Sequence, residues 1–288
     1  MLSILGFFQQ SQYKRMAKLK IGIVGCGAIG GSLAGAIVRD FSKQTKLVAL
    51  YDIDILKAKR LSKAVCKNKD LSVNNLDQLI NKSELVIECA SAKSSWSIAQ
   101  NVLKNGRNIM IMSVGGIVEH YQELKVLAED KNVNIYIPSG AICGIDGLKA
   151  AGCGKINKVI LTTKKPPKAF LGVPYVSKKG IHLDNINEDT VLFEGTALTA
   201  IMAFPQNINV AATLSLAGVG LANTIVRIVV SPNITRNIHE IEIESEAGKV
   251  TTRTENVIHP DNPKTSYLAV LSAVATLKQI LEPIKIGT

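Results

Sequence analysis

The chain has 288 residues, of which 47% are hydrophobic and 20% charged, a composition typical of a soluble globular protein and not of a disordered one. This length is sufficient for two domains with a large buried core. The formal net charge is +11, but the lysines are scattered and only 5% of the residues are aromatic, so we expect no nucleic-acid partner. A lysine-rich surface that attracts anionic metabolites is the better interpretation.

The chain has five cysteines, an odd number without a C-x-x-C pair, which argues against a disulfide framework and a zinc site. We therefore expect free thiols, a cytoplasmic protein and no metal. The longest apolar stretch, residues 213–230, is interrupted by glycine, serine, asparagine and arginine. It predicts a buried helix rather than a membrane span, so we expect no membrane association.

Residues 1–16 precede the first strand-like pattern. Their apolar residues come before the positive charges, the reverse of the order in a secretory signal peptide, and no small-residue cleavage site follows. Met16 leads directly into the first predicted strand. We expect residues 1–16 to be an extension outside the fold.

The first predicted strand is followed by a glycine turn and the start of a helix. Gly25 permits the tight turn, Gly27 lets the backbone approach a pyrophosphate, and Gly30 lets the helix pack close to the strand. The helix N-terminus then faces the phosphates. The candidate cofactor-binding residues of this turn are Gly25, Gly27, Ala28, Ile29 and Gly30.

The second predicted strand ends at Asp52, 22 positions after Gly30. A carboxylate at that point accepts hydrogen bonds from both ribose hydroxyls of NAD and repels the 2′-phosphate of NADP. We therefore expect a nicotinamide cofactor, with NAD favoured and NADP not excluded. The alternative is a glycine turn that only packs a helix onto a sheet.

Short apolar runs alternate with longer amphipathic ones as far as Pro138, which predicts a doubly wound parallel sheet. The loops at 91–94 and 113–116 follow predicted strands, where ligands of such sheets bind, and are candidate cofactor walls. The predicted strands are 21–24, 47–51, 85–89, 109–112 and 135–137, and the predicted helices are 28–41, 55–65, 94–105 and 119–131.

After Pro138 the pattern changes to strands with fewer helices. We expect strands at 158–163, 191–194 and 237–244, a long helix at about 209–222 and a last helix at 268–281. The fold class is then α/β, with an N-terminal Rossmann-type domain and a smaller α+β domain. The expected domains are 17–138, to which 259–288 returns, and 139–258.

In the predicted strand 237–244, strict alternation puts His239 on the same face as Ile241 and Ile243, and the glutamates on the other face. Such a histidine is either a core residue satisfied by the backbone or an acid/base aimed into a site. The other histidines, His120, His182 and His259, have the flanking residues of surface or capping positions, although His259 lies near a later motif.

Six motifs follow one another along the chain: the glycine turn at 25–30 and the segments 139–147, 162–167, 204–212, 237–239 and 262–266. In this order they resemble the L-aspartate dehydrogenase family, and the match runs from about residue 18 to 280. The resemblance implies oxidation of L-aspartate to iminoaspartate with NAD(P), reversal from oxaloacetate and ammonia, and a supply of iminoaspartate for NAD synthesis. It also implies cofactor contacts at Ala141 and Asn207, an acid/base at His239, and a homodimer whose second domain is both catalytic and the interface.

The chain departs from the family pattern at Lys164, where the family often has arginine, and in its N-terminal extension. Lysine is a point charge without the bidentate geometry of arginine, so recognition of the substrate carboxylates stays open. Suitable donors by residue type are Thr163, Lys164, Lys165, Lys264 and Thr265.

Alternatives remain for the site and for the function. Asn207 either holds the nicotinamide carboxamide or caps the following helix. Another dehydrogenase of the aspartate pathway, similar to homoserine dehydrogenase or dihydrodipicolinate reductase, is the second enzyme interpretation. A nicotinamide-binding sensor without turnover is the third.

Overall fold

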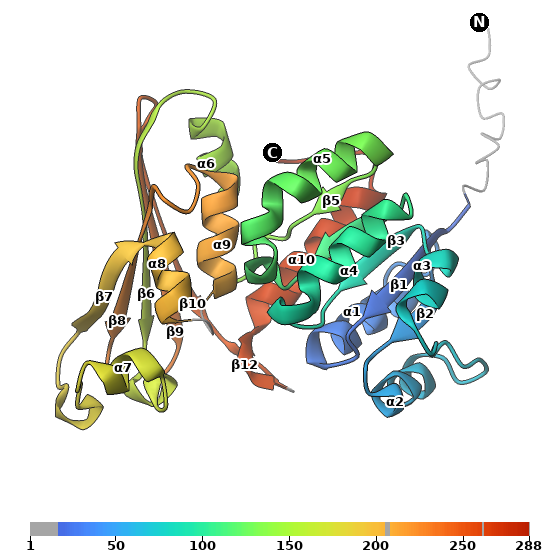
Figure 1. Ribbon diagram of the computed structural model, residues 1–288, viewed down its shortest axis with the longest axis horizontal. Helices are drawn as coiled ribbons and strands as arrows, with labels where there is room; N and C mark the ends of the chain where they lie inside the picture. The colour runs from blue at the N-terminus through green and yellow to red at the C-terminus, as the bar shows by residue number, and fades with distance from the viewer. Residues whose placement is uncertain (1–16, 205–207, 261, 288) are drawn as a thin grey trace, which may run out of the picture.

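The structure is a computed structural model that describes residues 17–204, 208–260 and 262–287. Two five-stranded sheets, each with its own helices, lie side by side in the molecule (Figure 1). The predicted extension, residues 1–16, lies outside the described residues. No helix in the described part of the chain is long and apolar enough to cross a membrane.

The first sheet is entirely parallel, with strand order β2-β1-β3-β4-β5. This confirms the predicted doubly wound α/β class, and each predicted strand is present within a few residues. The strands are β1 (Leu19–Val24), β2 (Thr45–Tyr51), β3 (Leu85–Glu88), β4 (Asn108–Ile111) and β5 (Ile135–Tyr136). The helices are α1 (Ala28–Arg39), α2 (Ile55–Val65), α3 (Leu76–Lys82), α4 (Ala92–Lys104) and α5 (Tyr121–Lys131), with 3-10 turns η1 (Val114–Gly116) and η2 (Val118–His120).

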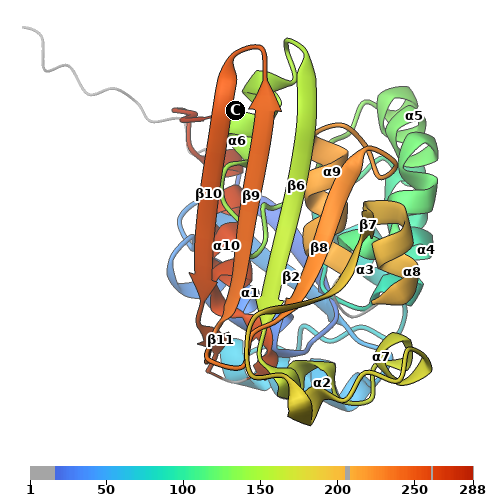
Figure 2. The same ribbon diagram turned by 90° about the vertical axis from the view of Figure 1, so that its left-hand side faces the viewer.

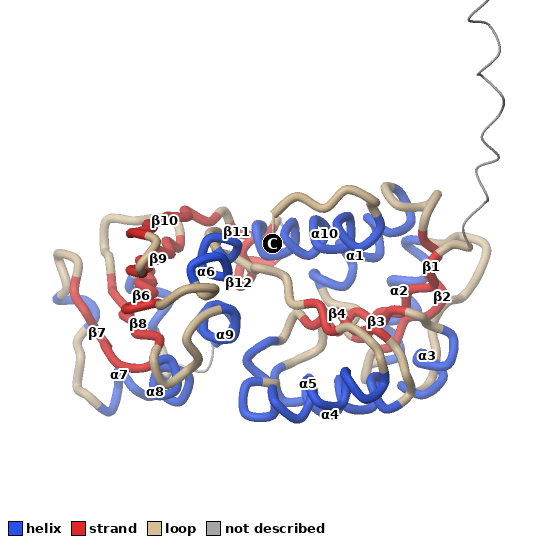
Figure 3. The backbone as a smooth tube through the Cα atoms, turned by 90° about the horizontal axis from the view of Figure 1, so that it is seen from above, coloured by secondary structure: helices blue, strands red, loops and turns tan. Residues whose placement is uncertain are grey.

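Helices cover both faces of this sheet (Figure 3). On one face Leu33 and Ile37 of α1 pack against Ile21 and Ile23, and on the other Val102 and its neighbours on α4 form a second apolar layer. Burial on both faces explains why these strands are almost continuously apolar. The sequence pattern did not predict α3, a helix of only seven residues.

The second sheet is mixed, with order β10-β9-β6-β8-β7, in which only β6 and β8 are parallel. Its helices lie on one face, and Figure 2 shows the opposite face uncovered. The strands are β6 (Ile156–Lys165), β7 (Thr190–Thr196), β8 (Thr224–Val230), β9 (Asn237–Ser245) and β10 (Gly248–Asn256). The helices are α6 (Ile145–Ala151), α7 (Pro174–Lys178), α8 (Ala197–Ala203) and α9 (Ile208–Ala217), with 3-10 turns η3 (Pro167–Phe170) and η4 (Leu183–Asn185).

The prediction of one buried helix over 213–230, and of a helix reaching residue 222, is wrong. Helix α9 ends at Ala217, Gly220 adopts a left-handed φ of 81°, and strand β8 begins at Thr224. Glycine tolerates that φ, and the β-branched residues that follow favour a strand. An apolar run of this kind does not by itself distinguish a buried helix from a buried strand.

The last helix, α10 (Tyr267–Leu281), lies against the first sheet, where Ala273 and Leu277 join the core that contains α1. The short strands β11 (Ile258–His259) and β12 (Asn262–Ser266) lead into it from β10. The chain thus crosses between the sheets after β5 and again after β10. The Gly140 N–H in the first crossing donates a hydrogen bond of 3.0 Å to Ser272 Oγ, which ties this crossing to α10.

Candidate functional site

The glycine turn has a tight geometry. Gly25 has a φ of 93°, and a Cβ there would overlap the carbonyl oxygen of Cys89; a Cβ on Gly30 would overlap the carbonyl oxygen of Gly25. A Cβ on Gly27, in contrast, would meet nothing within 4 Å. The turn therefore packs closely on the protein side and leaves open space beside Gly27.

These features fit a dinucleotide pyrophosphate. Gly27 is the N-cap of α1 and supplies no side-chain cap, so the N–H groups of Ala28 and Ile29 in the first helical turn are available to an anion. Asp52 follows the end of β2, where its Oδ2 accepts a hydrogen bond from the Cys26 N–H at 2.8 Å and its Oδ1 from the Asp54 N–H at 2.9 Å. Both bonds fix the carboxylate beside the turn.

The two cysteines near the turn are not poised as nucleophiles. Burial, reinforced by Asp52, raises the pKa of Cys26 to about 12, and burial raises the pKa of Cys89 well above its usual value. A thiol must lose its proton to act as a nucleophile. The part of the chain that the structure describes holds no cluster of three metal-ligating side chains.

His239 lies on the helix-covered face of the second sheet, between Thr163 of β6 and Thr254 of β10. The predicted alternation is confirmed, since His239, Ile241 and Ile243 are buried. Nδ1 of His239 lies 3.0 Å from Oγ1 of Thr163, and the two residues are 7% and 4% exposed. This histidine is bonded to a side chain rather than to the backbone.

Lys164 and Lys165 lie on opposite faces of β6. Lys165 shares the face of Thr163, whereas Lys164 lies on the uncovered face, 3.3 Å from Asp189 and 3.7 Å from Glu240. Of the two predicted carboxylate donors, the structure therefore brings only Lys165 to His239. Successive side chains of a strand alternate between its faces, but residues 160–163 are all buried, so only the pairing of Thr163 with His239 shows which lysine faces inward.

Electrostatics couple Lys165 and His239. Burial, together with the ammonium of Lys165, lowers the pKa of His239 to about 3, so the imidazole is neutral at pH 7. Burial also lowers the pKa of Lys165 to about 8. The inner face of the sheet thus combines a neutral imidazole with a cation that is easily deprotonated.

Ala141, a predicted cofactor contact, lies in the first crossing between the sheets. Its carbonyl oxygen accepts hydrogen bonds from Thr254 Oγ1 at 3.1 Å and Asn256 Nδ2 at 3.0 Å, and Asn256 Oδ1 accepts one from Ser266 at 2.7 Å. The sequence did not identify Thr254 or Asn256. The strand alternation of 248–256 was the available signal, because it puts both on the face of His239.

The remaining candidates differ in what the structure describes. Asn207 lies outside the described residues, as does the side chain of Lys264, while Thr265 is half-buried in β12. The expectation of a surface or capping position for His259 is wrong. This residue is buried, its Nε2 lies 3.0 Å from Ser32 Oγ of α1, and its ring packs edge-on against Tyr267.

Two hydrogen bonds join the cofactor edge of the first sheet to residues of the second half. One is the bond between Ser32 and His259, and the other runs from the Gly115 N–H to Oδ1 of Asn209 at 2.9 Å. They connect the glycine-turn helix and the loop after β4 with β11 and α9.

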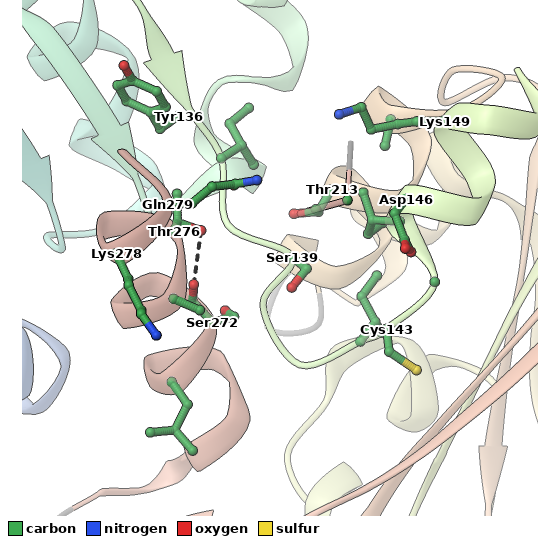
Figure 4. Close-up of a pocket in the computed structure, with 18 of the residues that line it drawn as sticks. Tyr136, Ser139, Cys143, Asp146, Lys149, Thr213, Ser272, Thr276, Lys278 and Gln279 are labelled. Atoms are coloured by element: carbon green, nitrogen blue, oxygen red, sulfur yellow. Dashed lines mark hydrogen bonds between the residues drawn. The ribbon is translucent and has the colours of Figure 1, made fainter. Parts of the chain in front are cut away.

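A cavity of about 1090 Å³ is a separate feature. Figure 4 shows Thr276 and Gln279 of α10 on one side of it, and Asp146 and Lys149 of α6 on the other. Neither the glycine turn nor Asp52, Thr163 or His239 contributes to its described lining. The chemistry of the inner sheet face therefore does not belong to this cavity.

Comparison with known proteins agrees with both halves of this arrangement. Residues 25–138 match the family model described as homoserine dehydrogenase, NAD binding domain, and residues 146–280 match aspartate dehydrogenase, C-terminal. A protein from Methanosarcina mazei named L-aspartate dehydrogenase is 47% identical over 275 residues, which cover 94% of this chain and 100% of that relative. One of the same name from Methanococcus maripaludis strain C6 is 41% identical over 94% of this chain and 100% of its own length.

Solved structures give the same result. The crystal structure of aspartate dehydrogenase from Thermotoga maritima superimposes with a TM-score of 0.70 and 27% identity, covering 94% of this chain and 100% of that one. A homoserine dehydrogenase from Thiobacillus denitrificans shares the fold, with a TM-score of 0.60 at 12% identity over 92% of this chain and 74% of its own. The chain therefore belongs to the L-aspartate dehydrogenase family of nicotinamide-dependent oxidoreductases.

Proposed function

We propose that this enzyme oxidises L-aspartate to iminoaspartate with NAD, and runs in reverse from oxaloacetate and ammonia. The observation that carries the proposal is the neutral His239 bonded to Thr163 on the same sheet face as Lys165. A base beside a cation suits a substrate that must lose an ammonium proton and has carboxylates to bind. Iminoaspartate made in this way would supply pyridine nucleotide biosynthesis.

His239 is the proposed acid/base. With Nδ1 bonded to Thr163, Nε2 takes one proton from the substrate ammonium, and the freed nitrogen lone pair forms the C=N bond as the hydride leaves Cα. A bound nicotinamide would supply the acceptor of the hydride and its two electrons. Burial is the main cause of the low pKa of His239 and the charge of Lys165 is the second; substrate carboxylates placed near Lys165 would offset that charge and so make the imidazole a stronger base.

Lys165 is the proposed partner of one substrate carboxylate. It lies on the face of His239, whereas Lys164 lies on the opposite face beside Asp189 and Glu240. For the second carboxylate we propose Lys264 and Thr265, which belong to β12, the strand that follows β11 and leads into α10. Lys164 is then a structural residue of the uncovered face.

The cofactor assignments follow the same logic. We propose that Ala28 and Ile29 bind the pyrophosphate beside the open space at Gly27, with Gly25 and Gly30 forming the turn. Asp52 binds the ribose and disfavours NADP. Ala141 and Asn207 hold the nicotinamide end, as the family resemblance implies.

We further propose a cytoplasmic homodimer that forms through the uncovered face of the second sheet. This face is five strands wide and carries intrachain ion pairs, such as Arg227 with Glu194 and Lys249 with Glu242. Light scattering coupled to size-exclusion chromatography is expected to give twice the 30.9 kDa chain mass. Charge reversal at Arg227 on this face should release monomers; a wild-type monomer would contradict the assignment.

The direct test is absorbance at 340 nm on mixing the enzyme with NAD and a panel of amino acids at alkaline pH. An increase in absorbance with L-aspartate supports the proposed reaction. An increase with homoserine but not with aspartate would instead support the second enzyme interpretation, a homoserine dehydrogenase. Binding of NADH without reduction of NAD by any substrate would indicate a sensor.

A further inference from the structure

A carboxylate that the proposed chemistry does not use lies at the centre of the cofactor edge. Glu88 is the last residue of β3 and is 0% exposed. Its Oε1 accepts a hydrogen bond from the Ala90 N–H at 2.7 Å, and its Oε2 accepts one from the Ser113 N–H at 3.0 Å and one from Ser95 Oγ at 3.1 Å. All three partners can donate, so the carboxylate form satisfies them together.

The two backbone donors belong to different loops. Ala90 lies in the loop after β3 and Ser113 in the loop after β4, so one side chain bridges both. The loops also interlock, because a Cβ on Gly116 of η1 would overlap the backbone of Ala92. A buried carboxylate costs free energy unless it is fully hydrogen-bonded, and this one is bonded chiefly to the backbone of the two loops.

The second half of the molecule holds the same loop from the other side. Oδ1 of Asn209 in α9 accepts the hydrogen bond from the Gly115 N–H at 2.9 Å. The 3-10 turn η1 and its N-cap Ser113 are therefore hydrogen-bonded to two elements: to β3 through Glu88, and to α9 through Asn209. Loops at the carboxyl ends of parallel strands are where open α/β sheets bind their ligands.

We infer that Glu88 is a positioning residue, which fixes the loops after β3 and β4 as one rigid wall against the nicotinamide end of the cofactor, with Asn209 as its partner from α9. The inference rests on the proposed function in that it takes hydride transfer to occur at this wall. Glutamine at position 88 has one acceptor oxygen, and its NH₂ would face a backbone N–H, so the bridge cannot be kept. Without the bridge the loops separate and the nicotinamide is held less closely.

The primary test is Glu88→Gln, measured by NADH fluorescence titration and by the deuterium isotope effect with L-aspartate deuterated at Cα. NADH affinity should fall about tenfold, and kcat by as much as about 10²-fold with a larger isotope effect, as for a misplaced reacting group. Leu79→Ala is the control for stability, because it removes a buried side chain of α3 in the same half and none of the hydrogen bonds to Glu88. Ser95→Ala removes one hydrogen bond to Glu88 but keeps both backbone bonds, so it should bind NADH more tightly than Glu88→Gln does.

A Glu88→Gln protein that loses thermal stability as Leu79→Ala does, yet binds NADH as the wild type does, would overturn the inference. Should Glu88→Gln fail to fold, variants of the exposed Asn209 test the inference through the same NADH titration. Asn209→Ala should weaken NADH binding several-fold, while Asn209→Asp, which keeps the acceptor oxygen, should not; equal affinities for both would overturn the inference. Absence of aspartate turnover in the wild type would instead count against the proposed function, because the NADH titration needs no substrate.

Discussion

Thr163 Oγ1 lies 3.0 Å from His239 Nδ1, and the two residues are direct neighbours across strands β6 and β9. Because the hydroxyl engages one ring nitrogen, it fixes the orientation of the imidazole and leaves Nε2 to meet a substrate. The orientation of the proposed acid/base is thus set within one sheet, by register and not by a loop.

Thr163→Val is expected to lower kcat about tenfold, the effect of one net hydrogen bond, with NADH affinity unchanged. Thr163→Ser restores the hydroxyl and should restore most of the rate. Steady-state kinetics of the three proteins provide the measurement. Equal rates for the valine and serine variants would show that the contact does not orient the ring.

Replacing His239 tests the acid/base directly. His239→Ala should lower turnover by about 10²- to 10⁴-fold, the usual loss for a positioned acid/base, and leave NADH affinity nearly unchanged. His239→Asn, which is polar but does not titrate, should be nearly as impaired and should lack the acidic limb of the pH–rate profile. Near-normal turnover in His239→Ala would reduce the histidine to a packing role.

Lys165 predicts a pH dependence of substrate binding. Its pKa of about 8 means that the ammonium is charged below pH 8 and is lost as the pH rises further. The affinity for succinate, which has two carboxylates and no amine, should therefore fall above pH 8 in the presence of NADH. Lys165→Gln should bind succinate weakly at every pH, whereas Lys164→Gln, on the opposite face, should keep the wild-type curve. A flat wild-type curve between pH 7 and 9.5 would exclude Lys165 as the donor.

His239 also links stability to pH. Its pKa is about 3 in the folded chain and 6.5 as the ordinary value, so between these values only the unfolded chain binds the proton. The neutral histidine stabilises the folded chain fully above pH 6.5, and this stabilisation is lost as the pH falls toward 3. The loss amounts to about 2 kcal/mol of unfolding free energy by pH 5. Urea denaturation at pH 7.5 and 5 should show a smaller acid loss for His239→Asn than for the wild type. A larger loss of stability at pH 5 in His239→Asn than in the wild type would mean that the ring is charged in the folded protein.

Asp52 predicts the choice of cofactor. Asp52→Ser removes the negative charge expected beside the ribose and should narrow or invert the preference for NAD over NADP in kcat/KM. The ratio of the two values in the parent and the variant is the quantity to measure. An unchanged ratio would show that another group sets the preference.

Local patterns explain what the sequence predicted well. The glycine turn, the strand ending at Asp52 and the alternation around His239 each depend on residues adjacent in the chain. Backbone conformation and strand period act over such distances, so these features can be read without knowing the fold.

Features that depend on distant parts of the chain were missed. His259 is buried because Ser32, 227 positions away, lies against it, and nothing beside His259 indicates that contact. Residues 224–230 were assigned to a helix because an apolar run hides its period, and only pairing with β6 and β7 identifies it as a strand. The register of β6 against β9 likewise shows that Lys165, and not Lys164, shares the face of His239.

The first crossing between the sheets is bonded to both halves, through Gly140 to Ser272 of α10 on the first sheet and through Ala141 to Thr254 and Asn256 of β10 in the second. The hydrogen bonds between Ser32 and His259 and between Gly115 and Asn209 also join the halves, so both bonds would have to open before the halves could swing apart. Such a swing would separate Lys165 and His239 from the glycine turn without disturbing the bond between Thr163 and His239, which lies wholly within the second sheet. Substrate exchange would then leave the acid/base oriented for the next turnover.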